Sequence, residues 1–193
     1  MSEMIDWHKN KTKGDFAEMI CKRHFKIMGY EVYETGIEKL APSFAKLQSN
    51  NKYITNIKKY IQNIPDFLVV CPDTKKASFV EAKYRTIIDT KDEKNLKKQL
   101  KEISKELHTK YNNLISQDIP IYFYLVTNTD PYIFIMKAKS LKYKEDVGGF
   151  YTAGEDKALS DMKFFKRNNT NPNDFNTVYS EVIKPYLDEH FKN

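Results

Sequence analysis

Hydrophobic residues recur at helical spacing in two long segments of the chain. In residues 13–29, KGDFAEMICKRHFKIMG, apolar side chains fall three or four positions apart, and the segment ends at Gly29, which suits a left-handed helix cap. A longer stripe of the same period comprises Leu96, Leu100, Ile103, Leu107, Tyr111 and Leu114, with lysines along its other side. Both segments are predicted to be helices that bury one face.

Short apolar runs with strand character lie between and after these helices. One is residues 31–36, two more are residues 66–71 and 77–84, which a polar turn joins, and a last pair is residues 119–128 and 132–138. The resulting order is helix, strand, insertion, strand, strand, helix, strand, strand. It predicts an α/β or α+β fold in which helices flank a central mixed sheet.

Two further segments lie outside this core. Residues 37–63 change character and place isoleucines at helical spacing after a polar SNN sequence, which predicts a helical insertion. Residues 139–193 form a C-terminal extension, with a short strand expected at residues 162–165. A last helix is predicted that Asp174 caps and that Pro185 kinks or interrupts.

Length and composition limit the class of protein. A chain of 193 residues favours one domain, residues 1–193, with its core at about residues 13–138. The formal net charge of +6 favours an anionic partner such as nucleic acid, although a lysine-rich solvated surface explains it equally well. Cys21 and Cys71 are expected to be free, buried thiols. With no long apolar run and no apolar leader, we expect a cytoplasmic protein without a membrane segment.

Charged residues interrupt the predicted strand at residues 77–84. Side chains alternate along a strand, so Glu81 and Lys83 share one face with Phe79. The carboxylate and the ammonium are therefore neighbours on that face.

The preceding strand brings a second carboxylate to the same place. If Cys71 and Ser78 close the hairpin, Asp66 lies opposite Lys83 and diagonal to Glu81, within reach of one shared ion. Two buried carboxylates repel each other and are costly to desolvate unless a positive charge compensates them. Oxygen ligands of this kind suit Mg²⁺ or Mn²⁺.

The same pattern has an ordinary structural explanation. Glu81 and Lys83 could lie on the solvent face of an antiparallel strand, while Asp66 follows Pro65 in a turn. Charges at alternating positions are common, and the spacing by itself favours this explanation.

Taken together, Pro65-Asp66 and Glu81-Ala82-Lys83 resemble the signature of the PD-(D/E)XK nucleases in its E-x-K form. The resemblance extends over about residues 14–128, including the order of helices and strands, and implies a restriction-endonuclease-like core. Residues 14–18, GDFAE, further resemble the G-x-x-x-E opening of archaeal Holliday-junction resolvase-like members, in which the helix glutamate helps to build the metal site.

This resemblance implies a Mg²⁺-dependent endonuclease, with Mn²⁺ as a substitute. Asp66, Glu81, Glu18 and the carbonyl of Ala82 would hold the ion. Lys83 would position the attacking water and stabilise the charge on the phosphate. Gln99 matches a glutamine or lysine that contacts phosphate or orients the lysine in several branches of the family. An equally good interpretation of Gln99 is a polar residue beside the apolar stripe.

The implied partner is nucleic acid, with DNA as the expected substrate, and cutting both strands of a duplex suggests a homodimer. Two other functions stay open: a nucleic-acid-binding module that keeps the fold without turnover, and a sheet that supports a protein-interaction surface. The insertion at residues 37–63 and the chain after residue 139 lie outside the resemblance, so it implies no substrate specificity.

Overall fold

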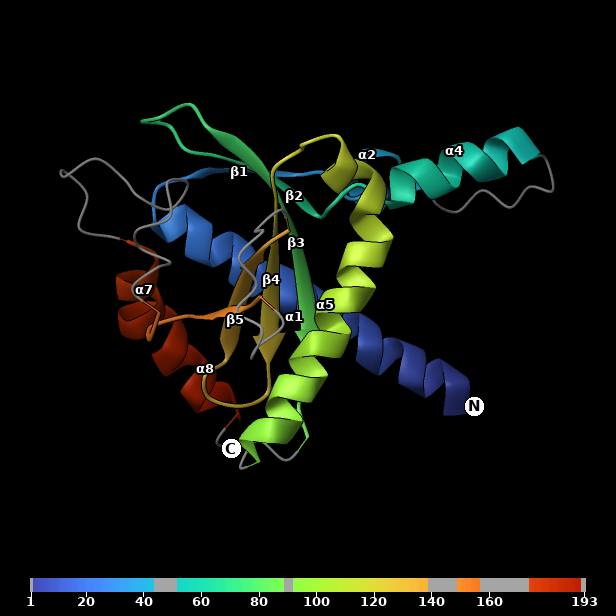
Figure 1. Cartoon of the computed structure of the whole chain (residues 1–193). Coiled ribbons are helices and arrows are strands. Elements are labelled where there is room, and N and C mark those ends of the chain that lie inside the picture. The colour runs from blue at the N-terminus through green and yellow to red at the C-terminus, as the bar shows by residue number, and fades with distance from the viewer. Residues whose placement is uncertain (1, 44–51, 89–91, 139–148, 157–173, 192–193) are drawn as a thin grey trace.

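Strands from both halves of the chain form one sheet at the centre of the computed structural model (Figure 1). The structure describes residues 2–43, 52–88, 92–138, 149–156 and 174–191. Within these residues the sheet has six strands, which lie side by side in chain order. Their bounds are Glu31–Glu34 (β1), Phe67–Val70 (β2), Ala77–Arg85 (β3), Ile121–Thr127 (β4), Ile133–Lys137 (β5) and Tyr151–Thr152 (β6).

Helices cover both faces of the sheet. Their bounds are Ser2–Ile27 (α1), Ile37–Leu40 (α2), Lys52–Gln62 (α4), Glu93–Ser116 (α5), Phe175–Val178 (α7) and Lys184–Phe191 (α8), with a π-helical turn at Tyr179–Ile183 between the last two. In Figure 1, α5 crosses in front of the sheet and α1 passes behind it. The predicted fold class is confirmed as α+β, with a mixed sheet flanked by helices.

The sheet is antiparallel except at its centre. β3 and β4 run parallel, whereas all the other neighbouring strands pair antiparallel. Parallel neighbours need a long connection, which α5 provides between the end of β3 and the start of β4. No helix in the described part of the chain is both long and apolar enough to cross a bilayer.

Alternation along β4 divides the core between the two faces. Tyr124 and Val126 pack with residues of α1 such as Phe25. Phe123 and Leu125 pack instead with the apolar stripe of α5. Because both faces are covered, β4 is buried along its whole length, as expected for a strand that reads as a continuous apolar run.

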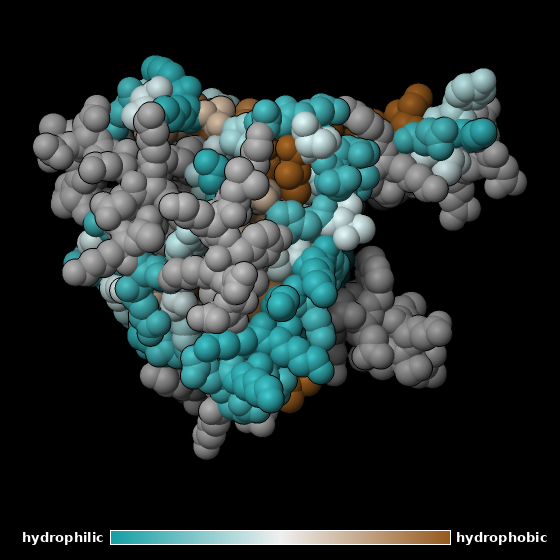
Figure 2. Space-filling model, viewed as in Figure 1, coloured by the Kyte–Doolittle hydropathy of each residue, from teal (hydrophilic) through white to brown (hydrophobic). Residues whose placement is uncertain are grey.

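The two long helices confirm the periodic patterns in the sequence. α5 buries Leu100, Ile103, Leu107 and Tyr111 of the predicted stripe, and its polar face is turned to solvent, as the teal surface over α5 in Figure 2 shows. α1 ends before Gly29, whose φ is 78°. It begins at Ser2 rather than near residue 13, because the polar residues ahead of the apolar pattern continue the helix.

The turn between β2 and β3 is tighter than predicted. Val70 pairs with Ala77, and the backbone N–H of Cys71 donates to the carbonyl of Lys76 at 2.8 Å. The predicted closure by Cys71 and Ser78 is therefore wrong by two residues. Since side chains alternate with a period of two, every side chain keeps its predicted face.

The outer segments agree in part with the predictions. Helices α2 and α4 confirm the predicted helical character at residues 37–40 and 52–62, and α4 projects from the body of the molecule in Figure 1. The Asp174 carboxylate accepts from the Thr177 N–H at 2.8 Å, which confirms the predicted cap. The π-helical turn lies immediately before Pro185, which has no N–H to continue an α-helical ladder. The strand expected at residues 162–165 falls outside the described residues, and β6 was not predicted.

A buried histidine links α1 to the C-terminal helices. His24 Nε2 lies 2.9 Å from the carbonyl oxygen of Phe175, and Nδ1 lies 2.8 Å from the Tyr124 hydroxyl. Because a carbonyl only accepts, Nε2 carries the hydrogen and Nδ1 accepts from the hydroxyl. Burial lowers the pKa of His24 to about 4, against the opposing effect of the Phe175 carbonyl. The imidazole is therefore neutral in the folded protein at pH 7.

We predict that the titration of His24 lowers the free energy of unfolding by about 2 kcal/mol when the pH falls from 7 to 4.5. The unfolded imidazole takes up a proton below about pH 6.5, whereas the buried one resists until about pH 4, so stability is lost between these values. Urea unfolding of the wild type and of His24→Gln at both pH values measures the difference in pH response. His190→Gln, at an exposed histidine, serves as the control. The same pH response in wild type and His24→Gln would contradict the prediction.

Candidate functional site

An open strand edge lies at the centre of the site. The last paired residues of β2 and β3 are Phe67 and Val80, yet β3 continues to Arg85 in contact with β4. On this stretch the backbone N–H of Ala82 donates to Asp66 Oδ2 at 2.9 Å. The N–H and C=O of one residue in a strand point to the same side, so the Ala82 carbonyl also faces this open edge.

Asp66 stands in the place of the missing strand. It lies one residue before Phe67, so the observed register puts it opposite Glu81, not opposite Lys83 as predicted. The two-residue correction thus brings the two carboxylates face to face.

Glu81 is a buried anion held by two lysines. Only 1% of the Glu81 side chain is exposed, and its Oε1 lies 2.5 Å from Lys83 Nζ and 3.0 Å from Lys110 Nζ. Burial favours the neutral acid, but the two ammonium groups outweigh it and lower the pKa of Glu81. Glu81 therefore remains charged inside the protein, and the solvent-facing alternative for this residue is wrong.

The second oxygen of Glu81 is not satisfied. Glu81 Oε2 and the Tyr111 hydroxyl are both buried, and the hydroxyl is near enough to help lower the pKa of Glu81, but neither atom makes a hydrogen bond of good geometry. Burial and the nearby Glu81 carboxylate raise the pKa of Tyr111 well above its usual range, so the phenol is neutral. A buried carboxylate oxygen without a partner is destabilising, and it marks a place where a cation or a water would be favourable.

The cations around Asp66 do not compensate fully for its burial and for the nearby carboxylates. Burial and then the charge of Glu81 raise the pKa of Asp66 to about 7, although Lys83 and the Ala82 N–H act in the opposite direction. Glu18 of α1 contributes to the same rise. The charge of Glu18 also acts on buried Cys21, whose pKa is raised chiefly by burial. The charges of Glu81 and Glu18 therefore both act on Asp66.

Lys83 completes this group as a cation. Burial alone would lower the pKa of Lys83, but the carboxylates of Glu81 and Asp66 raise it. The ammonium therefore keeps its proton at neutral pH. Lys83 can donate hydrogen bonds and stabilise negative charge, but it is not a base.

Gln99 lies apart from these residues. Its Nε2 donates to the Ile88 carbonyl at 2.8 Å, and its Oε1 accepts from the Ile88 N–H at 3.2 Å. Both ends of the amide thus bind the chain that leaves β3. The contacts of Gln99 are thus with the backbone of Ile88 and not with Lys83, as expected for the alternative of a polar residue beside the apolar stripe.

Lys110 is the site residue that sequence reasoning missed. It lies on α5 beside Tyr111, three residues after Leu107, at a position where a helical stripe continues. The spacing could have indicated this role, because a lysine three residues after Leu107 lies near the face of the helix that packs on the sheet. The stripe showed that α5 packs on the sheet but not which strand residue Lys110 would meet.

The donor set suits a hard divalent cation. Among the described residues, no three His, Cys, Asp or Glu side chains lie close enough together to form a ready metal site. The unsatisfied Oε2 of Glu81 and the raised pKa of Asp66 nonetheless both indicate a shortage of positive charge beside the open edge of β3. An ion at this point fits the residues present.

Comparisons of the chain with protein-family models, with curated proteins and with solved structures found no match.

We predict that Asp66→Asn stabilises the metal-free protein at pH 8 by a few kcal/mol. The raised pKa means that ionising Asp66 opposes folding, so the wild type loses stability as the pH rises from about 4 through about 7. The asparagine carbonyl can still accept from the Ala82 N–H. Urea unfolding in EDTA at pH 8 and pH 4.5 measures the effect, which should shrink to about 1 kcal/mol at the lower pH.

The exposed Asp15→Asn is the matched control, since it removes the same charge from the surface. Equal stability of Asp66→Asn and wild type at pH 8 would show that the Asp66 carboxylate is not strained by its surroundings.

Proposed function

We propose that this protein is a Mg²⁺-dependent endonuclease of the PD-(D/E)XK type, with a restriction-endonuclease-like core, that hydrolyses phosphodiester bonds in DNA. The observation that carries the proposal is the position of Asp66 at the open edge of β3, where it accepts from the Ala82 N–H beside Glu81, which Lys83 contacts. The order of α1, β1, β2, β3, α5 and β4 supports it, since it matches the order expected for that core.

Four groups would hold the ion. Asp66 and the Ala82 carbonyl face the open edge, Glu81 offers its unsatisfied Oε2, and Glu18 of α1, whose charge acts on Asp66, would be the fourth. When bound, Mg²⁺ supplies a more acidic water and stabilises charge on the phosphate. Binding also removes the repulsion that raises the pKa of Asp66, so both carboxylates can stay ionised together.

The lysines provide the electrostatic part of catalysis. Lys83 is a permanent ammonium at neutral pH, so it can orient the attacking water by hydrogen bonding and offset the charge that develops on the phosphate. Lys110 keeps Glu81 ionised by sharing Oε1 with Lys83, which leaves Oε2 for the ion. Lys110 acts through Glu81 and is therefore a positioning residue.

We predict that Glu81→Gln and Lys83→Met each reduce Mg²⁺-dependent cleavage of DNA at least 100-fold. Removing one preorganised electrostatic partner from an active site typically has an effect of about 100-fold to 1,000-fold. Nicking and linearisation of supercoiled plasmid in Mg²⁺, Mn²⁺ or EDTA measures the activity. The control is Lys98→Met, on the exposed face of α5. Full activity of Lys83→Met would refute the assignment.

We predict that Lys110→Met moves the acidic limb of the pH profile of cleavage toward higher pH. Lys110 lowers the pKa of Glu81, so its loss makes Glu81 easier to protonate, and activity at a fixed pH on the acidic limb should fall by about threefold to tenfold. Activity at pH 8, where Glu81 is ionised in both proteins, should change much less. Lys110→Arg restores the cation and should restore the profile. A uniform loss of activity at every pH would show a merely structural role.

A second candidate is a nucleic-acid-binding module without turnover. The observation that favours it is the engagement of Glu81 by two lysines, together with the lack of a ready three-ligand metal site among the described residues. DNA binding without cleavage in any of the metals would favour this module.

Cutting both strands of a duplex needs two sites, and we include a homodimer in the nuclease proposal on that ground.

A further inference from the structure

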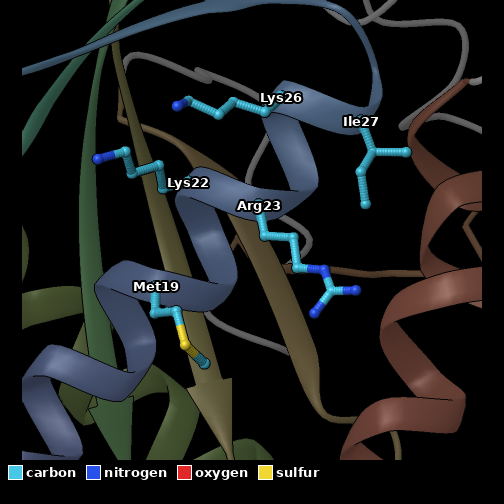
Figure 3. Close-up of a pocket in the computed structure, with 5 residues that line it drawn as sticks. All are labelled: Met19, Lys22, Arg23, Lys26 and Ile27. Carbon is cyan, nitrogen blue, oxygen red and sulfur yellow. The ribbon is translucent and has the colours of Figure 1, made fainter.

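A shallow basic hollow lies on the outer face of α1. It has a volume of about 400 Å³ and is lined by Met19, Lys22, Arg23, Lys26 and Ile27 (Figure 3). We call it the α1 groove. Met19 is 44% exposed, and Ile27 is half-buried, so the floor between the charges is apolar.

Positive charge exceeds negative charge around the α1 groove. In Figure 3, Lys22 and Lys26 extend toward the same side, one helical turn apart, whereas Arg23 extends toward the C-terminal helices. Lys22 pairs with Glu34 of β1, and the hydrogen bond from Lys22 is the main cause that lowers the pKa of Glu34. Lys39 and Lys26 act on Glu34 in the same direction.

The carboxylate of Glu34 is thus near the ammonium groups of Lys22, Lys26 and Lys39. Arg23 adds a fourth cation. Arg23 lies 5.5 Å from the ring centroid of Tyr186 on α8, which holds its guanidinium at the rim of the groove. An apolar floor with a cationic rim complements a chain that carries regular negative charge on an apolar framework.

The α1 groove adjoins the proposed catalytic site. Glu18 lies one turn before Lys22 on α1, so the helix itself joins the two. On the other side, Thr35 follows Glu34 and donates its N–H to the Asp66 carbonyl at 2.8 Å.

We propose that the α1 groove binds the phosphodiester backbone of the nucleic-acid strand that enters the site at Asp66 and Glu81, a role that rests on the proposed function. Phosphates pair with Arg23 and Lys26 at the rim, and sugar faces pack on Met19 and Ile27. Phosphate contacts of this kind position a strand without reading its sequence.

The test is a double substitution, Arg23→Gln with Lys26→Gln, which leaves the Lys22 ion pair and the site intact. Both side chains are exposed, so circular dichroism should show an unchanged fold. The matched control is Lys98→Gln with Lys101→Gln, which removes the same charge from the exposed face of α5, on the other side of the sheet. Fluorescence anisotropy of a labelled DNA oligonucleotide, in Ca²⁺ instead of Mg²⁺ and at several NaCl concentrations, gives the Kd and its salt dependence.

The double variant should bind at least tenfold more weakly at 100 mM NaCl. The slope of log K against log salt should fall by about 1.5, because each lost phosphate contact accounts for about 0.7 to 0.9. Lys26→Gln alone should give about half of that change. The control should stay within about threefold of wild type. Equal losses in variant and control, or an unchanged slope, would overturn the proposal.

Further outcomes distinguish the proposal for the α1 groove from the nuclease proposal and from an acidic protein partner. If wild type cleaves DNA and the double variant binds like the control, the groove assignment fails while the nuclease assignment stands. If wild type binds DNA through the groove but cleaves in no metal, the nuclease assignment fails and the groove stands. Displacement of DNA by polyglutamate at equal charge would overturn the nucleic-acid assignment in favour of an acidic protein partner.

Discussion

The buried charge of Glu81 is the constraint on which the site depends. A carboxylate that is 1% exposed needs positive partners, and Lys83 from its own strand and Lys110 from α5 both meet its Oε1. Because β2 stops while β3 continues, the open edge also admits Asp66, and the charges of Glu81 and, from α1, Glu18 raise the pKa of Asp66. Glu81 Oε2 has no hydrogen-bond partner and the pKa of Asp66 is raised, and the proposal of a metal site rests on this imbalance of charge.

Much of the fold and one face of the site could be predicted from local periodicity. The helical stripes of α1 and α5 and the alternating strands need only the geometry of each element. The placement of Glu81 and Lys83 on one face also follows from alternation along β3. Asp66 kept its predicted face although the hairpin register was wrong by two residues, because a displacement of two preserves the alternation. The face on which Asp66 lies was thus predictable, whereas the residue of β3 opposite it was not.

Contacts between elements far apart in the sequence were not predictable. The six-residue turn closed by Cys71 and Lys76 decides which residue faces Asp66, and turn residues alone did not settle that closure. Lys110 meets Glu81 only because of how α5 is rotated on the sheet, and the same rotation turns Gln99 to Ile88. The α1 groove is lined by residues of α1, but the contacts of Lys22 with Glu34 of β1 and of Arg23 with Tyr186 of α8 join elements far apart in the sequence.

A divalent cation should bind between Asp66 and Glu81, and crystals soaked in Mn²⁺ test this most directly. Anomalous scattering should reveal one ion at bonding distance from Asp66, Glu81 Oε2 and the Ala82 carbonyl, with Lys83 still beside Glu81. An ion found elsewhere, or none at millimolar Mn²⁺ with Asp66 and Glu81 unmoved, would contradict the claim that these carboxylates form a metal site.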